Sequence, residues 1–381
     1  MPQIRSMLMY GFAMFAMFFG SGNLVFPLQI GYENGDHWLL GFAGLLITGI
    51  ILPFLGLFVI KLHQGNYQSF FGGAGRLAQV VLPFAMLSLL GSFGVVPRCI
   101  TVAYGSMDYM MPGMSLMTFS FLFCLAMYLV CLNDRWMVNI LGKWMSPVLL
   151  IILIILTAMA IFHSPEPTSH HKAKEAFATG FLTGYQTMDL FAAFFFSALT
   201  FTQIQNKLPA GTSSQELIRF AIKSSLIAAI LLAMIYLGFV YLGAHYSFLI
   251  QDVPAESMLP TIAFYTMGKK ATTLIGFAML FSCLSTAIAL NNLYARYLCN
   301  LFNLKENKFY RVVLLTTGIA FIISLFDFRG IAAFLQPILE AFYPGIIGLV
   351  LISIVIKRHQ PLKMYLFYII TLITISYSYL K

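Results

Sequence analysis

The stretch Gly20-Ser21-Gly22-Asn23-Leu24-Val25-Phe26-Pro27 interrupts an apolar segment, residues 7–30, that is otherwise long enough to cross a membrane. A second membrane-length segment, residues 177–204, is interrupted by Gly184-Tyr185-Gln186-Thr187-Met188-Asp189. In hydrocarbon every backbone N–H and C=O group needs a partner, so a helix that opens there is expected to line a binding site. Two such interruptions in corresponding places of two halves are typical of secondary transporters. They predict a binding site between two broken helices.

The composition is that of a membrane protein. Of the 381 residues 60% are hydrophobic and only 9% are charged, whereas soluble proteins carry about 25% charged residues. The net charge of +9 comes from basic residues in short loops, and no basic patch alternates with exposed aromatic residues as in a nucleic-acid-binding surface. We therefore predict an all-α integral membrane protein that lies in the lipid bilayer. No nucleic acid is expected as a partner.

About eleven membrane spans are predicted from the lengths of the apolar segments. They cover residues 7–30, 38–60, 78–107, 115–131, 137–162, 177–204, 220–243, 271–298, 310–326, 330–356 and 364–380. With the N-terminus in the cytoplasm, 15 of the 22 Lys and Arg residues fall in inside loops, 6 fall outside, and Arg98 lies within a span. This distribution agrees with the positive-inside rule and predicts a multi-pass protein with a cytoplasmic N-terminus.

The placement of the two breaks predicts an internal repeat. Residues 7–162 hold spans 1–5 and residues 177–356 hold spans 6–10, and each group opens with a broken helix. Because five is odd, the second group crosses the membrane in the opposite sense, which gives a 5+5 inverted repeat. We expect one transmembrane domain over 1–381, with 364–380 as an extra C-terminal span.

The breaks themselves have a definite chemistry. Gly20 and Gly22 let the backbone leave helical geometry at low steric cost. The two half-helix ends then expose N–H groups, which favour an anion, and C=O groups, which favour a cation. A zwitterionic amino acid offers both charges, and an alkali cation needs only the carbonyls. The alternative is a glycine kink that serves helix packing alone.

Asp189 is the most informative single residue, because a carboxylate deep in a span is costly without a partner or a polar cavity. Asp189 could stay ionised beside a bound cation or a ligand ammonium, carry a proton, or belong to a buried structural pair. Asn23 is open to two interpretations as well. Its amide either contributes to a cation site or bridges two helices.

Three hydroxyl side chains, Ser282, Ser285 and Thr286, share one face of the span 271–298. Facing the open carbonyls of the first broken helix, they would suit a hard cation that takes oxygen ligands. The alternative is that each hydroxyl bonds back to a carbonyl of its own helix.

Two further charged residues lie within apolar segments. Arg98 follows Pro97 near the middle of the span 78–107, and its guanidinium cannot face lipid cheaply. We expect it to pair internally with Asp189 or Glu340 and to hold helices together. Glu340, between two prolines, is a second carboxylate partner or a proton carrier. No nucleophile elbow, zinc-protease motif or phosphate-binding loop is present, so we predict a protein that is not an enzyme.

Four motifs, in order, carry a resemblance to a known family. They are GSGNLVFP (20–27), VVPRCITVAY (95–104), GFLTGYQTMD (180–189) and LSTAIAL (284–290). Together they resemble the branched-chain amino acid:cation symporters, over about residues 5–357. That family is part of the group with the LeuT-type fold of two inverted five-helix repeats. The resemblance implies a bacterial inner-membrane symporter of leucine, isoleucine and valine, usually driven by Na⁺.

The resemblance also implies roles for the residues at the breaks. The substrate carboxylate would bind amides near Gly20, Ser21 and Gly22, and its ammonium would bind carbonyls around Gly184 and Tyr185, with Thr187 in the same site. Asn23 matches a position that often contributes to a cation site in this fold. The carbonyls of Ala16 and Phe19 would join Ser282, Ser285 and Thr286 around a second cation position.

Several alternatives stay open at this point. The coupling ion is Na⁺ or H⁺, the latter through Asp189 or Glu340, and no other cofactor is expected. Apolar walls discriminate by only about 1–3 kcal/mol per methylene, so transport of methionine or other apolar amino acids is an open alternative. A membrane amino acid sensor that binds without transport is the alternative from another class. Relatives usually carry twelve spans against eleven here, which leaves the side of the C-terminus and the oligomeric state open.

Overall fold

A computed structural model describes residues 2–108, 110–132, 145–162, 164–167, 173–207, 214–356 and 359–379. Within these ranges the secondary structure is helical, with no strand, so the all-α prediction is confirmed. The first half contains α1 (Pro2–Phe18), α2 (Ser21–Asn34), α3 (Trp38–Leu45), α4 (Leu52–Leu62), α5 (Tyr67–Phe71), α6 (Arg76–Leu90), α7 (Val95–Asp108), α8 (Leu116–Cys131) and α10 (Met145–Phe162).

The second half contains α11 (Ala173–Gln186), α12 (Asp189–Lys207), α13 (Ser214–His245), α14 (Ser247–Ile250), α15 (Met258–Leu301), α16 (Phe309–Ser324), α17 (Asp327–Val355) and α18 (Gln360–Tyr379). Every predicted span has a helix, although residues 137–144 of the fifth lie outside the described ranges. In the described part of the chain, 5 helical segments are long and apolar enough to cross a membrane. Their bounds are Ser21–Leu62, Arg76–Asp108, Gln215–His245, Ala255–Leu301 and Asp327–Val355.

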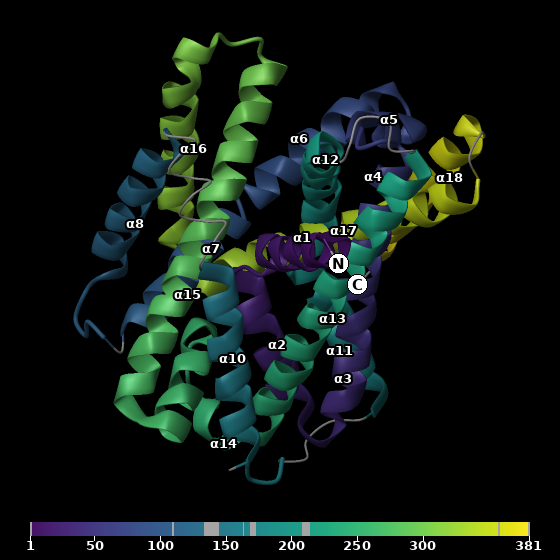
Figure 1. The fold of residues 1–381 in the computed structure, drawn as a ribbon. Coiled ribbons are helices and arrows are strands. Elements are labelled where there is room, and N and C mark those ends of the chain that lie inside the picture. Colours follow the sequence, from purple (N-terminus) through teal and green to yellow (C-terminus); the bar gives the residue numbers. More distant parts are fainter. Residues whose placement is uncertain are drawn as a thin grey trace.

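Both predicted breaks are present, but each is shorter than its polar run. Only Phe19 and Gly20 separate α1 from α2, and only Thr187 and Met188 separate α11 from α12. Figure 1 shows α1 and α2 leaving their junction in clearly different directions. The helices resume early because polar residues suit a first helical turn, where the backbone N–H groups have no intrahelical acceptor. The first break is therefore a joint of two residues.

A third interruption lies between α6 and α7, at residues 91–94, and the sequence patterns did not predict it. The sequence analysis placed Pro97 and Arg98 near the middle of a span, whereas Pro97 is the third residue of α7. A proline in the first turn of a helix removes an N–H group that has no intrahelical acceptor, so it causes no break. The interruption brings Arg98 to the start of a helix rather than to its middle.

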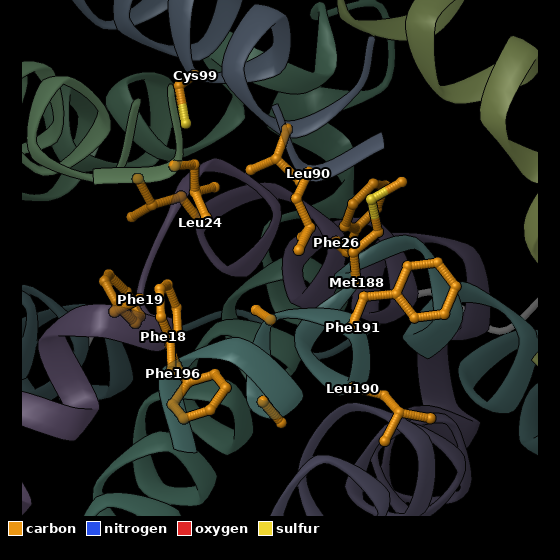
Figure 2. Packing of buried hydrophobic residues seen from close by; sticks show 14 of the residues in the cluster. Phe18, Phe19, Leu24, Phe26, Leu90, Cys99, Met188, Leu190, Phe191 and Phe196 are labelled. Carbon is orange, nitrogen blue, oxygen red and sulfur yellow. The ribbon is translucent and has the colours of Figure 1, made fainter. Parts of the chain in front are cut away.

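Small residues let the broken helices approach their neighbours. A Cβ atom added to Gly180 of α11 would lie 1.9 Å from the carbonyl oxygen of Gly41 in α3, so the two backbones touch. Such contacts between small residues are the usual basis of helix packing in membranes. Around the breaks the contacts are aromatic and aliphatic: Figure 2 shows Phe18 and Phe19, Leu24 and Phe26, and Met188 and Phe191 among the buried side chains.

Candidate functional site

The two breaks lie side by side at the centre of the helices. A Cβ atom added to Gly22 would be 3.4 Å from the Cα atom of Thr187, so the start of α2 lies against the second break. A Cβ atom added to Gly20 would be 3.0 Å from the Thr286 methyl group of α15. The glycines that the sequence analysis singled out therefore allow close approach of three elements.

Asp189 is the first residue of α12, and two neutral side chains bind its carboxylate. The Asn23 amide Nδ2 of α2 donates to Asp189 Oδ2 at 2.9 Å, and the Tyr236 hydroxyl of α13 donates to the same oxygen at 3.0 Å. The Asn23 amide also hydrogen-bonds the Tyr236 hydroxyl. Asp189 is only 4% exposed. A buried carboxylate is thus held at the junction of three helices.

Asn23 joins the two broken helices. Its Oδ1 atom accepts a hydrogen bond of 2.8 Å from the Gly20 N–H, while its Nδ2 atom reaches Asp189. This geometry is the helix-bridging arrangement considered for Asn23, and it also occupies the Gly20 amide. In a continuous helix that amide would donate to the Ala16 carbonyl, so the end of α1 keeps an acceptor that lacks its usual partner.

The second break is closed by local hydrogen bonds. The Thr187 hydroxyl donates to the Gly184 carbonyl at 2.9 Å, and the Met188 N–H donates to the Tyr185 carbonyl at 3.1 Å. The Asp189 N–H lies 3.4 Å from the Thr187 hydroxyl oxygen, which accepts from it. The carbonyls expected to face a ligand ammonium therefore already accept hydrogen bonds within the break.

Two of the three hydroxyls on α15 meet the first break. The Ser282 hydroxyl donates to the Phe19 carbonyl at 3.2 Å. Thr286 packs on Gly20, and its Oγ1 atom is buried with no hydrogen-bond partner in the described structure. The Ser285 hydroxyl bonds back to the Ser282 carbonyl of its own helix at 2.8 Å. Ser282, Thr286 and Phe19 thus form an oxygen-lined contact, and Ser285 stands apart from it.

Arg98 has a different partner from those expected. Its side chain is 0% exposed, and Nη1 donates to the backbone carbonyl of Gln186 at 2.8 Å. Its guanidinium carbon lies 5.3 Å from the centre of the Phe26 ring. Glu340 instead accepts a hydrogen bond of 2.8 Å from Gln336 on its own helix. The last carbonyls of a helix lack intrahelical donors, which explains why the end of α11 attracts the cation.

The contact between α7 and α2 continues at the next residue. The Cys99 thiol donates to the Ser21 hydroxyl at 3.4 Å, so the first turn of α7 lies against the first residue of α2. Arg98 is therefore close to both breaks.

Three functional candidates escaped the sequence analysis. Tyr236 binds Asp189, and Tyr343 of α17 stacks on Tyr185, with ring centres 4.5 Å apart, and on Phe191, at 4.6 Å. A tyrosine in an apolar span carries no signal that separates a ligand contact from packing.

Lys61 is the third of these residues. The sequence analysis counted it among the basic residues of the inside loops, but its side chain is 1% exposed. Its ammonium donates to the Ala221 carbonyl at 3.0 Å and also bonds the hydroxyl of Ser225 in α13.

Solved structures of transporters share this arrangement of helices. MhsT in complex with L-phenylalanine has a TM-score of 0.60 at 16% identity and covers 97% of both chains. Mhp1, a nucleobase-cation-symport-1 family transporter in a closed conformation with bromovinylhydantoin, has a TM-score of 0.64 at 14% identity, over 90% of this chain and 77% of that one. The likeness confirms the predicted LeuT-type fold.

Sequence comparison identifies the family. The branched-chain amino acid permease BraB of Bacillus subtilis is 30% identical over 364 residues, 93% of this chain and 81% of BraB. The permease BrnQ of Corynebacterium glutamicum is 27% identical over 92% of this chain and 81% of its own length. A family model described as branched-chain amino acid transport protein matches residues 3–380. The chain is thus a multi-pass membrane transporter rather than an enzyme, and it belongs to the branched-chain amino acid transport protein family.

Proposed function

We propose that this protein carries leucine, isoleucine and valine into the cell by symport with a cation, Na⁺ in the first instance, across the cytoplasmic membrane with its N-terminus inside. The observation that carries the proposal is the Asp189 carboxylate, buried where the two broken helices meet and held by Asn23 and Tyr236. A buried carboxylate in a membrane protein needs a function that repays its desolvation. Binding a cation or a ligand ammonium supplies that function.

The first break provides complementary groups for the rest of the substrate and for the ion. The amides of Ser21 and Gly22 open α2, and the helix dipole there favours a carboxylate. The Phe19 carbonyl with Ser282 and Thr286 offers oxygen atoms for a cation. The rings of Phe26, Phe191 and their neighbours supply an apolar wall for a branched side chain.

The transport cycle follows from the breaks. The helices that carry them, α1 with α2 and α11 with α12, bend at two-residue joints against the remaining helices. Binding of cation and substrate at the joints links these movements, and the site opens to one side of the membrane at a time.

Uptake of labelled leucine, isoleucine and valine into proteoliposomes tests the proposal. Uptake is measured with an inward Na⁺ gradient, with a pH gradient of the same size, and with neither, and unlabelled methionine is added as a competitor. Accumulation driven by Na⁺ alone supports the proposal. Accumulation driven by the pH gradient alone assigns the coupling to H⁺, and binding without flux under any gradient identifies a sensor. Accumulation that ignores both gradients refutes symport.

A further inference from the structure

Polar atoms without partners gather beside the second break. The Nε and Nη2 atoms of Arg98, the Oε1 atom of Gln186 and the hydroxyl of Tyr343 are all buried and have no hydrogen-bond partner in the described structure. Arg98 and Tyr343 are 0% exposed, and Gln186 is 8% exposed. Buried polar groups in native proteins are almost always satisfied, so several orphans in one place indicate a site that a ligand completes.

Contacts place these three residues next to one another. Arg98 Nη1 is bonded to the backbone of Gln186. The neighbouring residue, Tyr185, stacks on the ring of Tyr343. The cluster therefore spans α7, the end of α11 and α17, and it adjoins the Asp189 network.

The free atoms of Arg98 have a specific geometry. One nitrogen, Nη1, is fixed on Gln186, which leaves the Nε–H and the Nη2–H groups side by side on one edge of the planar guanidinium. That edge donates two parallel hydrogen bonds, and a carboxylate is the group that accepts both. Through Cys99 and its contact with Ser21, the same turn of α7 lies against the start of α2, where a carboxylate is also favoured.

We propose that Arg98 binds the α-carboxylate of the transported amino acid through Nε and Nη2, with the Tyr343 hydroxyl as a further donor. This inference rests on the proposed function and extends it, because it assigns the charged end of the substrate to a side chain as well as to backbone amides. Arg98 is then a substrate-binding residue rather than a structural tie.

The test compares ligands with and without a carboxylate on the purified full-length transporter. Affinities for L-leucine and for L-leucinamide, which keeps the ammonium and the side chain, are measured for wild type, Arg98→Lys and Arg98→Gln. We expect Arg98→Gln to weaken leucine binding by at least about 30-fold, the usual effect of removing one partner of a buried charged pair, and to leave leucinamide within about 3-fold of wild type. Arg98→Lys keeps the charge but loses the paired donors, so its leucine affinity should fall between those of wild type and Arg98→Gln.

Arg296→Gln is the matched control, because Arg296 lies on α15, where Nε bonds Asn292 and the guanidinium carbon lies 4.9 Å from the centre of the Phe309 ring. It should keep the wild-type ratio of leucine to leucinamide affinity. If Arg98→Gln keeps that ratio too, the proposal is overturned.

Tyr343→Phe is a second test, for the case that the Arg98 variants fail to fold. It removes only one hydroxyl, and an unchanged ratio of leucine to leucinamide affinity refutes the proposal equally. Binding needs no gradient, so a result here stands whether or not uptake is coupled, and wild-type protein that binds no branched-chain amino acid overturns both proposals.

Discussion

The Tyr236 hydroxyl donates to Asp189 Oδ2 at 3.0 Å, and this bond connects α13 to the first residue of α12. Asn23 of α2 donates to the same oxygen. Two neutral donors thus stabilise one buried carboxylate, and they come from α2, which follows the first break, and from α13. Any ligand that binds this carboxylate also acts on all three helices.

Replacing the Asp189 carboxylate by an amide tests whether transport needs its charge or only its shape. Asp189→Asn keeps the shape of the side chain but removes its charge, so we expect gradient-driven leucine uptake to fall by at least about 30-fold. Uptake into proteoliposomes measures the effect, and Asp252→Asn is the control because it makes the same change at an exposed carboxylate. Normal uptake by Asp189→Asn would show that the carboxylate is structural. The mutant does not distinguish Na⁺ from H⁺, since both need the charge.

Removing the phenolic donor should weaken the same site more gently. Tyr236→Phe deletes one hydrogen bond to a charged group, which contributes about 1.5–3 kcal/mol, so the half-saturating cation concentration should rise about 10- to 100-fold. Tyr246→Phe is the matched control, because the Tyr246 hydroxyl is equally buried but donates to the neutral Ala160 carbonyl at 2.8 Å. Equal effects of both changes on cation dependence would contradict a direct role for Tyr236.

The unpartnered hydroxyl of Thr286 allows a test of the cation position at the first break. Thr286→Val keeps the shape and removes Oγ1, so the half-saturating Na⁺ concentration should rise about 10-fold while leucine affinity at saturating Na⁺ stays the same. Thr157→Val is the control, since Thr157 Oγ1 is also buried without a partner in the described structure but belongs to α10. A Na⁺ dependence that matches wild type would remove Thr286 from the cation site.

Helix packing can be tested without touching the polar site. A Cβ atom in Gly180→Ala would lie 1.9 Å from the Gly41 carbonyl oxygen, so α3 and α11 would have to separate. We expect a loss of about 1–3 kcal/mol in stability, measured as a lower thermal unfolding midpoint. Gly318→Ala in α16 meets no atom within 4 Å and should be neutral or slightly stabilising. Similar midpoints for the two variants would refute the close contact.

Much of the fold could be predicted from the sequence, because long apolar segments and their polar interruptions are local patterns. The two breaks at Gly20 and near Thr187 are examples, although their length was overestimated. Local patterns do not show that Ser21-Gly22-Asn23 continues as a helix, since that depends on the Asn23 side chain accepting from Gly20. The interruption before α7 was missed because residues 91–94, Gly-Ser-Phe-Gly, form no polar run within the apolar segment.

Residues of the site could be predicted only where a single side chain is energetically unfavourable in a membrane span. Asp189 and Arg98 stand out as charges within apolar segments, and the structure places both beside the breaks. Their partners are a different matter. Tyr236 is 47 residues away from Asp189 in sequence, and Gln186 is 88 residues away from Arg98. Neither residue type is unusual in a membrane helix. The expected pairing of Arg98 with a carboxylate was reasonable from charge, but a backbone carbonyl at a helix end is the neighbour that it meets.

The two joints also differ in how their backbones are held. Gly20 adopts an extended conformation with φ −121°, which is relaxed for any residue, whereas Met188 has φ +57° in the left-handed region. A side chain in that region costs about 1–3 kcal/mol. The second break therefore holds local backbone strain, and the first does not. A conformation in which residue 188 returned to a negative φ would release this energy, so a change of shape at the second break would be favoured by the backbone itself.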